Sequence, residues 1–164
     1  VALGVDLNAL VRWVTALGVA AYNNQKEAVS FLILNGADIN LKEHVKFFVI
    51  PYTNQAPSMK LHRMSVIQIA AEIGSLELCK LLVSLGAKLN DFGDDEYSEL
   101  SFAKDKATAR LLIKMGSEIE AKDKNGNTAM TILAHRPYWK GHAEQALMLK
   151  ELGAEAREYK CSSV

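Results

Sequence analysis

The segment Gly36-Ala37-Asp38-Ile39-Asn40 decides the fold, because closely similar five-residue segments recur along the chain. The other copies are Gly4-Val5-Asp6-Leu7-Asn8, Gly86-Ala87-Lys88-Leu89-Asn90, Gly116-Ser117-Glu118-Ile119-Glu120 and, shortened, Gly153-Ala154-Glu155-Ala156. Five of the ten glycines therefore occupy equivalent positions. Recurrence at such spacing indicates a row of small repeated units, each too small to bury its apolar face alone.

An apolar stripe at helical spacing precedes each of the last four glycine segments. The stripes are Val29-Phe31-Leu32-Leu34, Leu78-Leu81-Leu82-Leu85, Leu111-Leu112-Met115 and Leu147-Leu149-Leu152. Glycine is favoured directly after a helix because that position adopts a left-handed backbone conformation. We therefore expect a helix to end at each of these four glycines.

A second, shorter apolar segment lies upstream of each stripe and opens with Ser or Thr. These segments are Thr15–Ala21, Ser65–Ala71, Ser98–Ala103 and Thr128–Ala134. A hydroxyl at that position can accept a hydrogen bond from a free amide of the first helical turn. Each unit is thus expected to contain a short helix, a turn, a second helix, a glycine and an extended linker.

These residues resemble the ankyrin-repeat family, whose unit is about 33 residues long. Asp123-Lys124-Asn125-Gly126-Asn127-Thr128 is similar to the family's entry hairpin, and residues 36–40 are similar to its exit. No copy keeps the Pro or His of the family's T-P-L-H signature. The resemblance covers residues 4–156. It implies an all-α solenoid of stacked helix-turn-helix units with projecting β-hairpin linkers, one of them elongated.

The resemblance predicts a repeat domain over 1–156 and a tail over 157–164, with four full repeats and the end of a preceding one. The expected repeats are 8–40, 64–90, 97–120 and 125–156, with an insert over 41–63. The insert follows from the 50 positions between Ala20 and Ala70. Only 30 positions separate Gly86 from Gly116, which indicates a short deletion between the two helices of the third unit. The fourth unit carries about four extra residues around 136–142.

The insert is basic and aromatic. It contains Phe47, Phe48 and Tyr52, and its four Lys and Arg residues against one Glu give it a net charge of +3. One interpretation is an elongated finger that presents the three aromatic side chains to a protein partner. The other is that some of these aromatics fold back and seal the stack, since an apolar run in a linker needs cover.

The next linker is acidic. Phe92, Asp94, Asp95 and Glu96 lie in it, without the alternating ligand spacing and closing Glu of an EF-hand. We therefore expect a solvated acidic tip rather than a metal site. As a contact surface it would suit a basic partner.

Family architecture places the first helices and the hairpins on the concave face. There we expect Tyr22, Glu72 and His135 to reach solvent. The apolar residues at an equivalent position are expected to pack between repeats; they are Val19, Ile69, Phe102 and Ile132. In the enlarged turn of the last unit, Tyr138 and Trp139 have two open interpretations, a binding hot spot or a cap on the exposed end of the stack.

Chemical signatures of catalysis are missing. The four histidines show neither metal-ligand spacing nor a neighbouring nucleophile motif, and no phosphate-binding glycine loop occurs. Cys79 lies within a helical stripe, where a core role is expected. We therefore predict a chain that is not an enzyme, with no catalytic residue, metal or cofactor.

Charge and composition narrow the class of partner. Nineteen basic and nineteen acidic residues give a net charge of zero, which argues against generic nucleic-acid or membrane binding. We predict a cytoplasmic, monomeric scaffold module for protein–protein interaction, using hairpin tips, insert and concave groove. The alternatives are a substrate-recruiting domain of a larger enzyme, an effector acting in a host cytosol, and a structural spacer.

Overall fold

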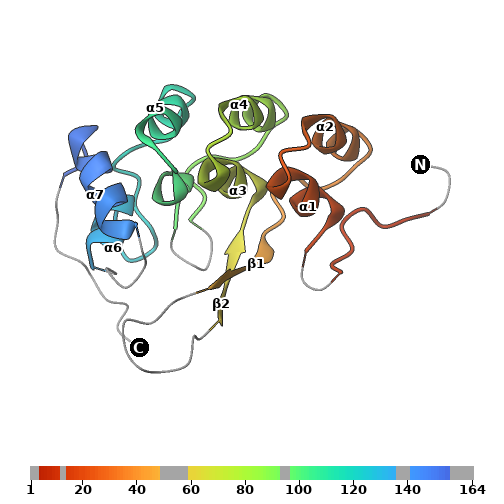
Figure 1. Cartoon of the computed structure of the whole chain (residues 1–164), viewed down its shortest axis with the longest axis horizontal. Helices are drawn as coiled ribbons and strands as arrows, with labels where there is room; N and C mark the ends of the chain where they lie inside the picture. The colour runs from red at the N-terminus through yellow and green to blue at the C-terminus, as the bar shows by residue number, and fades with distance from the viewer. Residues whose placement is uncertain (1–3, 12–13, 49–58, 93–96, 136–140, 156–164) are drawn as a thin grey trace.

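The structure is a computed structural model that describes residues 4–11, 14–48, 59–92, 97–135 and 141–155, excluding the side chains of 43–48 and 59–62. The chain folds into a row of helix pairs, joined by linkers and interrupted by one antiparallel hairpin (Figure 1). In chain order the elements are α1 (Ala16–Tyr22), α2 (Lys26–Leu34), β1 (Glu43–Phe48), β2 (Met59–Met64), α3 (Val66–Ile73), α4 (Leu76–Ser84), η1 (Glu99–Phe102), α5 (Lys106–Lys114), α6 (Ala129–His135) and α7 (His142–Glu151).

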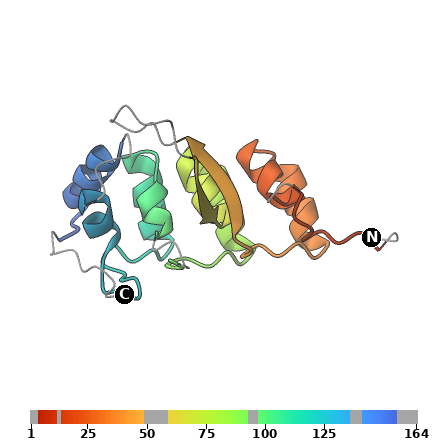
Figure 2. The same ribbon diagram turned by 90° about the horizontal axis from the view of Figure 1, so that it is seen from below.

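The pairs stack side by side in two layers. The first helices form one row, in which α1 packs on α3, α3 on η1 and η1 on α6, while α2, α4 and α5 form the second row. The hairpin β1–β2 leaves the stack beside α3, on the side away from the second helices (Figures 1 and 2). The predicted all-α solenoid with one elongated hairpin linker is therefore confirmed.

Hydroxyl caps begin the first helices as predicted, with one exception. Thr15 Oγ1 accepts from the Gly18 amide at 3.2 Å, and Thr128 Oγ1 accepts from the Thr131 amide at 3.3 Å. At α3 the amide of Ser65 donates to Gln68 Oε1 at 2.9 Å, which is half of a capping box. The cap predicted at Ser98 is wrong: its side chain makes no cap bond. The carbonyl of Ser98 closes the single turn of η1 instead, accepting from the Ser101 amide at 3.0 Å.

The repeated glycines end the second helices as predicted. Gly36 has a φ of +101°, and the glycines at 86, 116 and 153 have φ values of +98°, +116° and +104°. At each one the following amide reaches back into the last helical turn; for example, the Ala37 amide donates to the Leu32 carbonyl at 3.0 Å. Side chains other than glycine rarely adopt this conformation, so the repeat can be recognised from its glycines alone.

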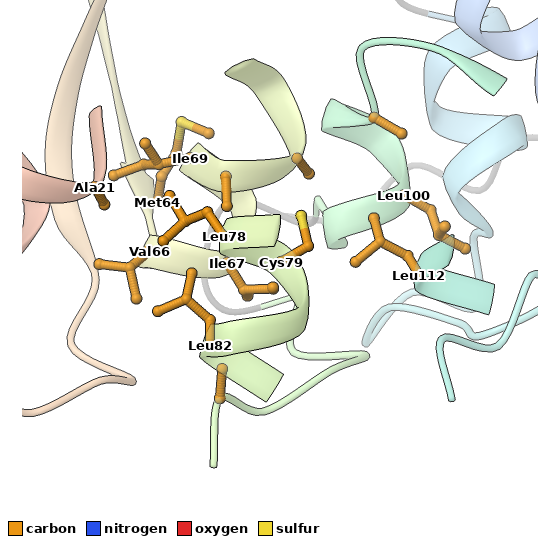
Figure 3. Close-up of a cluster of buried hydrophobic side chains, with 14 of the residues drawn as sticks. Ala21, Met64, Val66, Ile67, Ile69, Leu78, Cys79, Leu82, Leu100 and Leu112 are labelled. Atoms are coloured by element: carbon orange, nitrogen blue, oxygen red, sulfur yellow. The ribbon is translucent and has the colours of Figure 1, made fainter. Parts of the chain in front are cut away.

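The core runs through the stack between neighbouring helix pairs (Figure 3). Its centre is made by α3 and α4, whose Ile67, Ile69, Leu78 and Leu82 are at most 2% exposed. Cys79 lies among them, fully buried, and burial raises the pKa of its thiol to about 11. Its predicted place in the core is therefore correct, and its thiol stays protonated and unreactive at neutral pH.

Three apolar side chains of the first unit are exposed, one of them contrary to prediction. Val19 was expected to pack between repeats but is 51% exposed, because no described element covers its side of α1. Phe31 and Leu34, from the apolar stripe of α2, are 63% and 76% exposed. A comparison of the units reveals the reason for Leu34, because its equivalents are polar: Ser84, Lys114 and Glu151. That position faces outward in every unit.

The deletion predicted between the two helices of the third unit instead shortens the first helix of that unit. The helix η1 has four residues where α3 has eight, and Asp105 begins α5 two residues after Ala103. Asp105 Oδ1 accepts from the Thr108 amide at 2.8 Å, which lowers the pKa of the Asp105 carboxyl. The deletion thus removes a helical turn without disturbing the start of the next helix.

Candidate functional site: a partner-binding surface

Among the predicted contact residues that the structure describes, Tyr22, Glu72, Phe47 and Phe48 lie on the first helices or on the hairpin. The strands β1 and β2 pair in antiparallel register from Glu43 opposite Met64 to Phe48 opposite Met59. Phe47 lies in β1 opposite Lys60, next to Phe48. The hairpin therefore carries these two aromatic residues out to the far end of the paired region, six residues from the base of β1.

The base of the hairpin is tied to the next linker by an ion pair. Lys42 Nζ lies 3.1 Å from Asp91 Oδ1 and also donates to the Asp91 carbonyl at 3.3 Å. The Lys42 side chain is only 13% exposed. Lys42 was counted among the basic residues offered to a partner, and this assignment is wrong, because its charge is already paired within the stack. The basic insert and the acidic linker contact each other through their first residues.

Tyr22, Glu72 and His135 lie at the carboxyl ends of three of the four first helices, α1, α3 and α6. Tyr22 is 59% exposed and His135 is also exposed, as predicted. The Nδ1 atom of His135 lies 3.0 Å from the Thr131 carbonyl, a contact that fixes the ring on its helix. The prediction for Glu72 is only partly right, because this residue is half-buried.

The Glu72 carboxyl is the most perturbed acid in the described part of the chain. Its Oε2 atom is buried and has no hydrogen-bond partner among the described residues. Burial raises the pKa of this carboxyl from 4.5 to about 7. A half-buried carboxylate without a donor gains stability when a cationic or hydrogen-bonding group approaches it. Glu72 is thus suited to receive a donor from a bound molecule.

The acidic linker is described only at its two ends. Phe92 is half-buried, and the tip residues Asp94, Asp95 and Glu96 lie outside the described residues. Directly after them Tyr97 is buried, with its ring centroid 5.5 Å from that of Phe102 and 6.2 Å from that of His142. The linker therefore returns to the stack through an aromatic anchor that the sequence did not reveal.

Three more predicted contact residues also fall outside the described ranges: Tyr52, Tyr138 and Trp139. Phe47 and Phe48 are placed by their backbone alone. Within the described ranges, no group of three or more His, Cys, Asp or Glu side chains is arranged to hold a metal ion. No helix found there is long and apolar enough to cross a membrane.

This chain is similar to one family model and to curated proteins that are longer than it. Residues 13–44 match the ankyrin-repeat family model. A probable 26S proteasome regulatory subunit p28 of Saccharomyces cerevisiae is 33% identical over 130 residues, which is 76% of this chain and 50% of that protein. Ankyrin repeat and SOCS box protein 6 of Homo sapiens is 25% identical over 135 residues, 75% of this chain and 28% of that protein.

A shorter and stronger similarity covers 40 residues. It is 58% identical to the Arf-GAP with ANK repeat and PH domain-containing protein cnt-1 of Caenorhabditis elegans, over 24% of this chain and 5% of that protein. This chain spans half or less of the length of each curated relative named here. The similarity to each of these relatives is thus confined to part of a longer protein.

Proposed function

Because this chain belongs to the ankyrin-repeat family, whose repeats are protein–protein interaction modules, we propose that it binds a protein partner without catalysing a reaction. The observation that carries the proposal is the hairpin β1–β2, which leaves the stack at one linker (Figure 1). Aromatic side chains are the type that is enriched in protein interfaces and that often dominates their binding energy. Phe47, Phe48 and Tyr52 form this proposed finger.

The rest of the proposed contact surface continues from the finger over the first helices. It includes Tyr22, Glu72 and His135 at the ends of α1, α3 and α6, and Phe92 of the next linker. Lys46 and Lys60 of the insert favour an acidic patch on the partner opposite the finger. Glu72 favours a basic or hydrogen-bonding group of the partner near α3.

The experiment is a pull-down that compares two triple variants. The first changes Phe47, Phe48 and Tyr52 to serine. The matched control changes three exposed apolar residues of the second helices to serine: Phe31, Leu34 and Leu147. Both variants must keep the helical circular dichroism and the melting temperature of the parent chain to within a few degrees.

The proposal expects partners that bind the parent chain and the control but are lost from the finger variant. Retention of every partner by the finger variant would refute the role of the finger. A loss confined to the control variant would move the binding surface to the second helices. Recovery of no specific partner by any of the three proteins would favour a structural spacer.

A second candidate function is supported by the comparisons. The chain spans half or less of the length of these relatives, and the names of two of them include a PH domain or a SOCS box beside the ankyrin repeats. We infer that this chain can also serve as the substrate-recruiting or targeting part of a larger protein. Expression of the entire open reading frame, with mass spectrometry of its partners, tests this role. A full-length protein without any further domain would contradict it.

A further inference from the structure

Each residue of the first repeat unit corresponds to the residue 50 positions later in the second unit. Helix α2 begins at Lys26 and α4 at Leu76, while the caps Thr15 and Ser65 precede α1 and α3. The side of each pair that faces the preceding unit can therefore be compared residue by residue. In the first unit this side includes Val14, Ala16, Val19, Ala28 and Leu32, and its equivalents in the second unit are Met64, Val66, Ile69, Leu78 and Leu82.

In the second unit all five of these side chains are at most 1% exposed. They are covered because α1 packs on α3 and α2 packs on α4 (Figure 3). Ile132, the equivalent of Val19 in the last unit, is likewise fully buried, next to η1. In the second and last units, this side of the helix pair is thus the receiving half of a repeat–repeat interface; Phe102, the equivalent residue of the third unit, is half-buried.

In the first unit the same side is open. The five equivalent residues line a hollow of about 440 Å³, together with Val11, Thr15, Ala20 and Gln25. None of these lining residues carries a charge. Ala16 and Ala28 replace Val66 and Leu78, so the hollow is deeper here than the surface that α1 and α2 cover in the second unit.

Exposed apolar side chains gather at this end of the molecule. Of the eight large hydrophobic side chains that are exposed among the described residues, seven lie between positions 5 and 34. Val11 is 73% exposed and Val5 is 61% exposed. Val11 and Val19 line the hollow, and exposed apolar side chains gathered at a hollow are typical of an interface.

A linker of the repeat type already runs along this face. The Asp38 amide donates to Asn8 Oδ1 at 2.8 Å, the same bond that the Lys88 amide makes to Asn40 Oδ1 at 2.9 Å. Gly4 has the left-handed backbone expected of a residue that follows a helix, with a φ of +62°. Residues 4–8 are therefore held as the exit segment of a unit that would lie in front of α1.

We propose that the hollow beside α1 and α2 is the receiving half of a repeat–repeat interface, and that its occupant is one further helix pair of the same polypeptide, directly before Gly4. The side chains that this pair presents are apolar and bulky enough to enter the space left by Ala16 and Ala28. The uncharged lining and the continuity with the α1–α3 interface favour this occupant over a charged partner surface. The inference is independent of the finger and its partner.

A thiol reporter at Val19 tests the proposal. All proteins carry Val19→Cys and Cys161→Ser, and the remaining native thiol of Cys79 is fully buried. The test protein has a copy of residues 14–35 fused before Gly4, so that a helix pair precedes the exit segment. The control has the same extension with Val29→Asp in the copy, because Val29 is fully buried in α2 and its loss unfolds the added pair. A second extension, a copy of residues 64–85, is tested in the same way in case the copy of residues 14–35 does not fold.

The rate of maleimide labelling at position 19 is the readout. We expect fast labelling of the unextended protein and of the control, and labelling slower by about tenfold or more with a folded extension, because a covered thiol reacts only after local opening. Equal rates in both extended proteins and in the control would overturn the proposal. Labelling of the unextended protein could also slow as the protein concentration rises. That result would overturn the proposal, because the occupant of the hollow would then be a second copy of this chain.

Discussion

The side chain of Asn40 accepts a hydrogen bond from the backbone amide of Lys88 at 2.9 Å, although the two residues are 48 positions apart. The same bond recurs from Asn8 to Asp38, from Asn90 to Glu118 and from Glu120 to Glu155, each at 2.8 Å. The side chain of the last residue of each glycine segment therefore accepts a hydrogen bond from the backbone amide of the third residue of the next segment. An acceptor is required at that position, which explains why Glu120 can replace asparagine there.

The first prediction concerns this chain of bonds. Asn40→Ala should lower the free energy of unfolding by about 0.5 to 1.5 kcal/mol, because it leaves the Lys88 amide without its protein acceptor. Urea denaturation followed by circular dichroism measures the effect. Lys88→Ala is the matched control, since the donor is the backbone, and it should change stability by much less. Equal losses in the two variants would show that the bond contributes nothing.

Two buried serines should respond differently to the same substitution. Ser117 Oγ donates to the buried carboxylate of Glu99, while Ser101 Oγ is buried without a hydrogen-bond partner among the described residues. Ser117→Ala should cost about 1 to 3 kcal/mol of unfolding free energy, because a buried carboxylate loses a donor. Ser101→Ala should be neutral or slightly stabilising. Thermal melts of both variants test the pair, and a larger loss in Ser101→Ala would contradict the assignment.

The raised pKa of the Glu72 carboxyl predicts that the stability of the chain depends on pH. The pKa of its carboxyl is about 7 in the folded chain and near 4.5 when exposed, so the folded state binds the proton more tightly. The contribution of Glu72 to stability is therefore complete below pH 4.5 and falls as the pH rises toward 7. Glu72→Gln should abolish this fall, and so stabilise the chain at pH 8 more than at pH 4.5, in urea titrations at both values.

Glu77→Gln, which removes an exposed carboxylate from α4, is the control for the loss of one charge. If Glu72→Gln and the parent chain lose stability in parallel between pH 4.5 and 7, Glu72 is not the group responsible.

The ion pair of Lys42 with Asp91 should show measurable coupling. A double-mutant cycle with Lys42→Met and Asp91→Asn should give about 1 kcal/mol of coupling at low salt, since the Lys42 side chain is only 13% exposed. The coupling should shrink in 1 M NaCl. The pair of Lys106 with Glu151, at 2.8 Å and with both side chains more exposed, is the comparison and should couple more weakly. A stronger coupling between Lys106 and Glu151 than between Lys42 and Asp91 would refute the link between burial and coupling.

Local patterns predicted the repeat well because they depend on backbone conformation. The glycines at 36, 86, 116 and 153 were recognised as helix ends, and each has the left-handed φ that this role requires. The hydroxyl caps at Thr15 and Thr128 were recognised for a similar reason, since the donor lies three residues away in the chain. The short spacing of the third unit predicted a deletion, but the structure places it within the first helix rather than between the two helices.

Solvent exposure was predicted less well, because it depends on elements far away in the sequence. The apolar stripe of α2 does not distinguish Leu32, which lines the face toward a neighbouring unit, from the exposed Leu34. Glu72 looks like a surface acid in the sequence, and only the packing of the stack withdraws one of its oxygens from water. The contact surface on the finger stays a prediction.

The sequence by itself determined the repeat, its helix ends, its caps and the position of its long hairpin, because each of these follows from the conformational preferences of residues close together in the chain. The tertiary structure alone decided which apolar residues are covered, that Lys42 is neutralised by Asp91, and that the face beside α1 is open. These properties belong to pairs of units rather than to any one unit. Burial and charge pairing depend on what a neighbouring helix pair supplies, and the chain brings those neighbours together only when it stacks.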